Sequence, residues 1–318
     1  MQPASPLLRI GTRGSPLALA QAHETKRRLA AAHAELGDDR AIEIVVISTL
    51  GDRVGGPLTE IGGKGLFTGE LEDALETGAI DLAVHSMKDM PTWLPDGLAV
   101  VAMLPREDPR DLMLVDKERL GAINRIADLP QGATVGTSAL RRQAQLLFHR
   151  PDLKIVGLRG NVGTRMRKLS EGAFDMTLLA LAGINRLGID ASVGTPLEGA
   201  EMLPAVAQGA IGIEISRRNT QARHFVQALD DANTHICVAA ERAMLAVLDG
   251  SCRTPIAGYA TLGTDGSMLI EGLVAKPDGS ELHRHSVQGN AADGLALGVE
   301  LAQVLKDRAG DGFFRPAD

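Results

Sequence analysis

The alternation of strand-like and helix-like segments is the feature that most limits the possible folds of this chain. Residues 7–13, 42–48, 80–85 and 98–104 are short apolar runs typical of buried strands, and helical spacing lies between the first three of them. Such alternation is typical of parallel β-α-β units and indicates an open α/β sheet. Sheets of this kind bind ligands at the carboxyl ends of their strands, so those ends are where we expect chemistry.

The same alternation is repeated in the second third of the chain. A charged, proline-containing stretch at residues 105–111 interrupts the pattern, as a hinge or crossover would. Strand-like runs at residues 134–136, 153–158 and 176–181 then lead into helical segments, the first of which we expect to begin at Ser138. These runs predict a second α/β domain. A further strand near residue 210 fits either sheet.

The order of elements changes after about residue 230. A helix precedes Cys252, and strand-like runs follow near residues 256–262, 268–275 and 281–287, with Asp-Gly pairs at the turns between them. A final helix is predicted near residues 292–306. Strands joined by tight turns and flanked by helices predict a small α+β domain.

Composition excludes several functional classes. With 318 residues, 44% of them apolar, the chain can fill more than one core. It has no apolar run of about 18 residues and no signal peptide, so we expect a cytoplasmic protein that binds no membrane. A net charge of -7 and 3% aromatic residues disfavour nucleic-acid binding. Two cysteines form no disulfide framework, and eight histidines show no zinc spacing, so we expect no metal.

Cys252 lies in a loop, residues 249–258, that joins a predicted helix to a predicted strand. A free cysteine is more often a small buried side chain than a reactive group, which is our interpretation of Cys237 in its apolar helical run. Arg253 could stabilise a Cys252 thiolate, whereas a helix C-terminus disfavours the anion. The residues alone leave the structural and the chemical roles of Cys252 open.

Arginines recur where predicted strands end and predicted helices begin. A cation in the first turn of a helix opposes the helix dipole by about 0.3–1 kcal/mol, so the adjacent Arg141 and Arg142 suggest a compensating anion. The guanidinium group suits carboxylate or phosphate. A ligand with several acidic groups would account for Arg13, Arg141, Arg142, Arg159, Arg165 and Arg186. Solvated surface arginines with a few salt bridges are the alternative.

Residues 85–92 leave a predicted strand with an unusual density of polar side chains. Asp89 in this stretch could cap a turn, the commoner role of an aspartate there. It could equally stabilise a developing cation or transfer protons, and the sequence leaves both open. The Gly-rich segment around Lys64 is no P-loop, because Leu58 and Gly65 occupy positions where that motif needs other residues. We interpret it as a loop whose lysine reaches an anion.

Several blocks of this sequence, in the same order, resemble the porphobilinogen deaminase family, also called hydroxymethylbilane synthases. The blocks are residues 10–18, 62–67, 83–91, 106–111, 140–143, 158–162, 180–188 and 203–209. A series of blocks in the right order is far more specific than any single block. The resemblance covers almost the full length and is weakest near the C-terminus.

The resemblance implies a transferase that condenses four porphobilinogen molecules head to tail, with loss of ammonia, into the linear tetrapyrrole hydroxymethylbilane. It implies a dipyrromethane cofactor, held by a thioether on Cys252, and no metal. Asp89 falls on the family's catalytic aspartate, where a carboxylate would stabilise the azafulvenium cation left by ammonia. The six arginines fall on positions that bind acetate and propionate groups. Further cofactor or substrate contacts fall on Ser15, Lys64, Ser86, Lys88, Thr137 and Gln208.

The resemblance also implies the architecture and the partners. We expect an α/β protein with two periplasmic-binding-protein-like α/β domains, a central cleft and a smaller C-terminal α+β domain. The expected boundaries are residues 1–104 with about 203–226, residues 105–202, and residues 227–318. We expect a monomer that takes porphobilinogen as its small-molecule substrate and passes its product to the next tetrapyrrole enzyme.

Two rival functions remain. A two-domain solute-binding protein would share the fold and could use the same arginines without any reaction. The missing export signal and the cysteine-bearing third domain argue against it. A thiol redox protein using Cys252 would need a resolving partner, and none is close in sequence. The chain also departs from common family residues at Glu60 and Ala139, but neither change removes a group that the chemistry requires.

Overall fold

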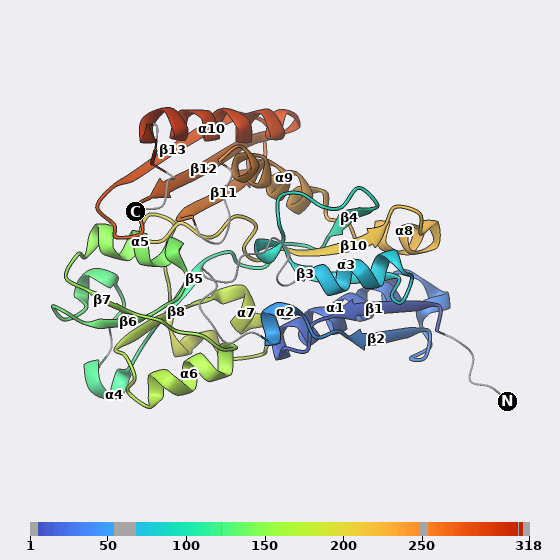
Figure 1. Cartoon of the computed structure of the whole chain (residues 1–318), viewed down its shortest axis with the longest axis horizontal. Helices are drawn as coiled ribbons and strands as arrows, with labels where there is room; N and C mark the ends of the chain where they lie inside the picture. The colour runs from blue at the N-terminus through green and yellow to red at the C-terminus, as the bar shows by residue number, and fades with distance from the viewer. Residues whose placement is uncertain (1–5, 54–67, 122, 249–253, 311, 314–318) are drawn as a thin grey trace. The chain divides into compact units, whose positions relative to one another are not determined.

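The computed structural model describes residues 6–53, 68–121, 123–248, 254–310 and 312–313 (Figure 1). The chain divides into two compact units, unit 1 with residues 1–106 and 210–235, and unit 2 with residues 107–209 and 236–318. Among the described residues, no helix has both the length and the apolar composition that crossing a bilayer requires.

A five-stranded sheet forms the centre of unit 1, in the order β2-β1-β3-β10-β4. Its strands are β1 (Leu8–Thr12), β2 (Ile42–Val46), β3 (Leu82–Ser86), β4 (Leu98–Met103) and β10 (Ile211–Ser216). β1 pairs in parallel with β2 and β3, as the alternation predicts. β10 runs antiparallel to β3 and β4, so the strand that the sequence left unassigned belongs to this first sheet.

Helices cover the sheet of unit 1. They are α1 (Pro16–Ala32), α2 (Leu50–Arg53), α3 (Gly69–Glu76) and α8 (Thr220–Gln227), with short turns η1 (Ala34–Leu36) and η2 (Met87–Asp89). Ile10, Leu29 and Ile213 are fully buried in one core cluster, which joins α1 to the strands. The hydroxyl of Ser15 accepts a hydrogen bond from the Ala18 N–H at 3.2 Å and so caps α1.

The second sheet lies in unit 2, in the order β7-β6-β8-β5-β9. Its strands are β5 (Asp111–Val115), β6 (Thr134–Gly136), β7 (Lys154–Val156), β8 (Met176–Ala180) and β9 (Thr195–Pro196). β6 is parallel to β7 and β8, whereas β5 is antiparallel to β8. β5 was not predicted, because its short apolar run directly follows the charged, proline-containing stretch at residues 105–111.

Helices also follow the strands of this second sheet. They are α4 (Lys117–Leu120), α5 (Leu140–His149), α6 (Val162–Ser170) and α7 (Leu181–Arg186), with short turns η3 (Ile126–Asp128) and η4 (Ala191–Val193). The predicted helix start at Ser138 is wrong, and α5 begins at Leu140. The Ser138 hydroxyl does not cap the helix, since it accepts a hydrogen bond from the Leu158 N–H at 2.9 Å.

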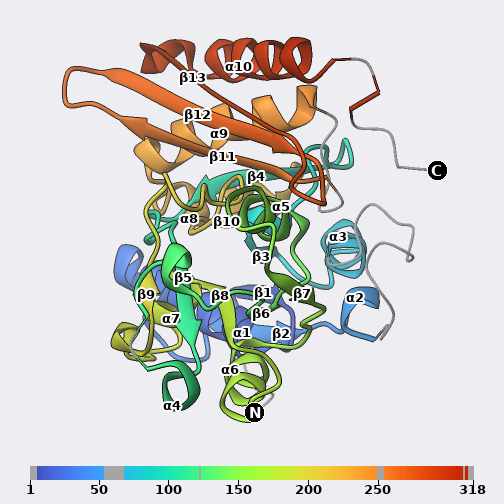
Figure 2. The ribbon, with the colours of Figure 1, turned by 90° about the vertical axis from the view of Figure 1, so that its left-hand side faces the viewer.

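The C-terminal α+β domain contains a three-stranded antiparallel sheet, in the order β11-β12-β13. Its elements are α9 (Ala232–Val247), β11 (Ile256–Leu262), β12 (Ser267–Ala275), β13 (Leu282–Asn290), η5 (Ala291–Asp293) and α10 (Gly294–Ala309). α10 packs along β12 and β13 (Figure 2). Gly266 and Gly279 adopt positive φ angles of 81° and 72° at the predicted turns, which glycine tolerates without strain. Cys237 is buried in α9, as predicted.

Candidate active site

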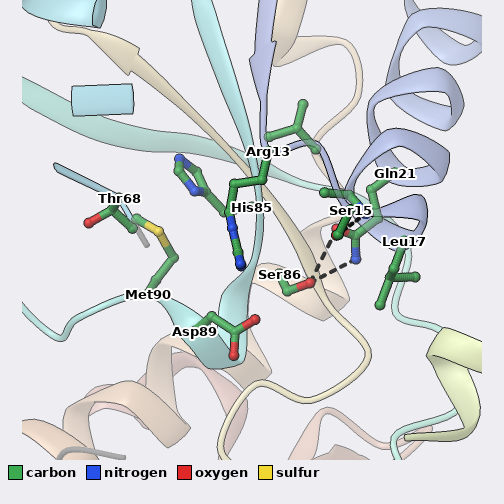
Figure 3. A pocket seen from close by; sticks show the side chains of 11 residues that line it. Arg13, Ser15, Leu17, Gln21, Thr68, His85, Ser86, Asp89 and Met90 are labelled. Atoms are coloured by element: carbon green, nitrogen blue, oxygen red, sulfur yellow. Dashed lines mark hydrogen bonds between the residues drawn. The ribbon is translucent and has the colours of Figure 1, made fainter. Parts of the chain in front are cut away.

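A pocket in unit 1 gathers residues from the ends of β1 and β3 (Figure 3). Arg13, Ser15, His85, Ser86 and Asp89 all line it. β1 and β3 are parallel neighbours, so their carboxyl ends reach the same edge of the sheet. The fold therefore brings four predicted site residues together and adds the histidine.

Asp89 lies on the turn η2, directly after β3. The Met90 N–H donates a hydrogen bond to the Met87 carbonyl oxygen at 3.3 Å, and both methionine side chains are buried. These buried neighbours anchor the turn, while Asp89 itself is exposed at the pocket. Lys88 is exposed on the same turn and is not among the residues that line the pocket.

Gln21 is a pocket residue that the sequence analysis missed. Its Nε2 donates a hydrogen bond to the Ser86 Oγ at 2.8 Å, and the Gln21 side chain is almost fully buried. This contact fixes the Ser86 hydroxyl at the pocket wall. Leu17, Ala18 and Gln21 follow helical spacing and face the pocket together, a pattern that could have revealed the glutamine.

A second group of predicted site residues surrounds Asp111 in unit 2. Arg141 Nη1 donates to Asp111 Oδ2 and Arg142 Nη2 donates to Oδ1, both at 2.8 Å. Gln208 Nε2 also donates to Oδ1, at 3.0 Å. Asp111 is fully buried, and the two arginines are 7% and 5% exposed. The anion predicted beside these arginines is thus at least in part a carboxylate of the chain itself.

The charge of this cluster is not balanced within it. Burial alone would raise the pKa of Asp111, but the two guanidinium groups hold that pKa well below its usual range. Two cations and one anion leave one excess positive charge. The Nε of Arg142 is buried and has no hydrogen-bond partner among the described residues. An anionic ligand group would supply both the charge and the acceptor.

The remaining predicted residues of unit 2 lie on segments that follow strands of its sheet. Thr137 is buried after β6, and Arg159 is half-buried after β7. Arg165 on α6 and Arg186 on α7 donate to backbone carbonyl oxygens at 2.8 and 2.7 Å. These positions belong to the edge where α/β sheets bind ligands.

Two predicted residues, Lys64 and Cys252, lie outside the described residues, and their roles stay predictions. In the part of the chain that the structure describes, no cluster of His, Cys, Asp and Glu side chains could hold a metal ion.

The sheets confirm the predicted α/β fold class, with two five-stranded sheets covered by helices and a smaller C-terminal α+β domain. One solved structure that the chain resembles is an ABC transporter periplasmic binding protein from Brucella ovis with glutathione bound. That likeness has a TM-score of 0.42 and 13% sequence identity, over 76% of this chain and 68% of the other.

Relatives matched by sequence are far more similar to this chain. The family model "Porphobilinogen deaminase, dipyromethane cofactor binding domain" matches residues 8–224, and "Porphobilinogen deaminase, C-terminal domain" matches residues 235–307. The chain is 53% identical over 313 residues to porphobilinogen deaminase of Paracoccus denitrificans, over 98% of this chain and 97% of that protein. It is 51% identical over 311 residues to the chloroplastic porphobilinogen deaminase of Oryza sativa, over 97% and 86%. The chain belongs to the porphobilinogen deaminase family.

Proposed function

We propose that Asp89 is the catalytic carboxylate and Cys252 the cofactor attachment point of a transferase that condenses four porphobilinogen molecules into linear hydroxymethylbilane. The reaction, its substrate and the dipyrromethane cofactor follow from the family. The roles of the individual residues are the proposal. The observation that carries it is the pocket where Asp89 lies with Arg13, Ser15 and Ser86.

The described residues fit a dipyrromethane, whose pyrroles carry acetate and propionate groups. The cluster around Asp111 has one excess positive charge, and the unpartnered Nε of Arg142 is a donor suited to a carboxylate. Arg13 and Ser15 add donors at the pocket in unit 1. When bound, the cofactor supplies the pyrrole carbon that joins the first substrate.

Asp89 acts on the cation that forms when ammonia leaves the substrate. An exposed carboxylate held at the pocket wall stabilises that positive charge. Arg13 in the same pocket binds an acidic side chain of the substrate. The pocket thus offers a negative group to the reacting carbon and a positive group to the carboxylates.

The other predicted residues bind the acidic side chains of the cofactor and the growing chain. They are Lys64, Lys88, Thr137, Arg141, Arg142, Arg159, Arg165, Arg186 and Gln208. Support comes from the excess charge around Asp111 and from the positions of Thr137, Arg159 and Arg165 after strands of the unit 2 sheet.

The proposal also covers the domain boundaries, the cellular location and the oligomeric state of the enzyme. Three domains, residues 1–104 with about 203–226, 105–202 and 227–318, are supported by the three separate sheets. Residues 1–106 and 210–235 together form one compact unit, which supports a first domain built from two segments of the chain. We assign the chain to the cytoplasm as a monomer that releases its product to the next tetrapyrrole enzyme.

Cys252→Ser is expected to abolish covalent priming and to reduce bilane formation at least 100-fold, because an alcohol replaces the sulfur that forms the thioether. The measurement is bilane production together with ammonia release from porphobilinogen. Cys237→Ser, at a buried position in α9, is the control that should keep its primer. Normal bilane production by Cys252→Ser would refute the attachment site. Binding of porphobilinogen by the wild type without ammonia release would favour a solute-binding protein.

A further inference from the structure

Two buried ionisable side chains lie side by side at the pocket in unit 1. His85 on β3 lines the pocket and is 6% exposed, and Glu214 on β10 is fully buried. The Nε2 of His85 lies 3.0 Å from the Oε2 of Glu214. The antiparallel register places His85 opposite Gly212, so Glu214, two residues further on, emerges on the same face of the sheet. Figure 3 shows His85 beside Arg13 and above Asp89.

This pair is a costly arrangement for a merely structural contact. The second carboxylate oxygen of Glu214 is buried and has no hydrogen-bond partner among the described residues. A buried polar group without a partner costs about 1–3 kcal/mol, and more if it is charged. A buried polar group without a partner in a native structure needs an explanation, of which a catalytic role is one.

Charged groups face His85 from each element around it. They are Glu214 on β10, Glu72 on α3, Arg13 after β1 and Asp89 on η2. α3 packs against both β3 and β10. Burial raises the pKa of Glu72, and the carboxylate of Glu214 raises it further, whereas His85 opposes the rise. The protonation of Glu72 therefore depends on the charges of both Glu214 and His85.

We propose that His85, oriented by Glu214, is the proton carrier of the pocket. The carboxylate of Glu214 accepts the hydrogen bond from Nε2–H, which leaves Nδ1 as the basic nitrogen of a neutral ring. In this division of roles the histidine moves the proton, while the buried carboxylate holds the ring and stabilises the imidazolium. The inference rests on the proposed function and adds a second group to Asp89.

The balance of the reaction identifies the proton that His85 carries. Each condensation breaks the C–N bond of the aminomethyl group, and the electron pair leaves with nitrogen as ammonia. A C–C bond forms at a pyrrole ring carbon, which then loses its proton. The substrate reacts with its aminomethyl group protonated, so neutral ammonia leaves first. Neutral His85 then takes up the ring proton and passes it to the released ammonia, which becomes ammonium. Asp89 stays anionic and stabilises the cation, so no further reactant is needed.

The pH dependence of kcat tests this role. His85→Gln should lower kcat about 100-fold or more and remove the fall in rate at low pH, because the base is absent. Glu214→Gln should shift that fall to lower pH, because the imidazolium loses its anion. His283→Gln is the control. His283 lies on β13, its Nε2 is 2.7 Å from the Oε1 of Glu281, and it does not line the pocket. Its profile should match the wild type.

A second measurement does not depend on turnover. Nitrogen NMR of the histidine rings in the unprimed Cys252→Ser protein should show His85 as the Nε2–H tautomer, with a titration that moves when Glu214 is also changed to Gln. This NMR measurement still tests the proposal in the case that the His85→Gln variant does not fold. A Glu214→Gln protein with reduced kcat but an unshifted pH profile and an unshifted His85 titration would show a structural pair only. In that outcome the proposed function would stand, because primed wild type would still form bilane.

Discussion

We expect Asp89→Asn to lower kcat by about 10²–10⁴-fold, while the protein stays folded and keeps its primer. The asparagine preserves size and removes the charge that opposes the cation left by ammonia. Asp89 is exposed, and its turn is anchored by buried Met87 and Met90, so the free energy of unfolding should change by no more than about 0.5 kcal/mol. Single-turnover rates of ammonia release measure the effect.

Asp73→Asn provides the matched control for Asp89. Asp73 is an exposed aspartate on α3 in the same unit and is not part of the pocket lining. Its variant should turn over at the wild-type rate. If Asp89→Asn kept a kcat within about threefold of the wild type, a factor worth only about 0.7 kcal/mol, the catalytic role of Asp89 would be wrong.

We expect Asp111→Asn to lower the free energy of unfolding at pH 7 by about 3–5 kcal/mol. Asp111 is fully buried and is the carboxylate that Arg141 and Arg142 both contact at 2.8 Å. Its removal leaves two buried cations with no carboxylate between them. Gln208 Nε2 donates to the same carboxylate at 3.0 Å and keeps only a neutral amide oxygen as its acceptor in the variant. Urea denaturation of the full-length protein, followed by circular dichroism, measures the loss.

The effect of Asp111 depends on pH in a defined direction. Burial would raise its pKa, but the two arginines lower it well below the usual range. A carboxyl with a lowered folded pKa contributes its full stability above the unfolded value of about 3.9, and that contribution is lost as the pH falls towards the folded value. The difference between wild type and Asp111→Asn should therefore be constant from about pH 5 to 7 and shrink below about pH 4.

Asp108→Asn is the comparison for Asp111, three residues earlier in the same charged stretch. Asp108 pairs with Arg110 at 2.7 Å, but these side chains are 26% and 37% exposed. Exposed ion pairs contribute about 0–1 kcal/mol, so this variant should lose little. Equal losses of stability in the two variants would contradict the account of a buried charge cluster.

The sequence predicts the order of strands and helices well where apolar periodicity is clear. It predicts the parallel pairs of β1 with β2 and β3, the cap of α1 by Ser15 and the three strands of the C-terminal domain. It misses β5, whose apolar run directly follows a charged, proline-containing stretch. It also leaves the antiparallel direction of β10 unspecified, because strand direction is set by tertiary pairing rather than by local pattern.

The residues of the candidate site were likewise predicted only in part. Arg13 and Asp89 were found because they follow strands, and the fold places both at one pocket. Gln21, Glu214 and Asp111 were missed as members of the site. Glu214 and Asp111 belong to strands otherwise rich in apolar residues, and their partners are 129 and 30 or more residues away. Only the folded chain reveals which distant group makes such a buried charge tolerable.

The most direct test of the central claim is the mass of the intact, freshly purified protein, followed by the mass of its Cys252 peptide. The account predicts an excess equal to one dipyrromethane on that peptide and none on the peptide of Cys237. An unmodified Cys252 in protein that actively forms bilane would contradict it.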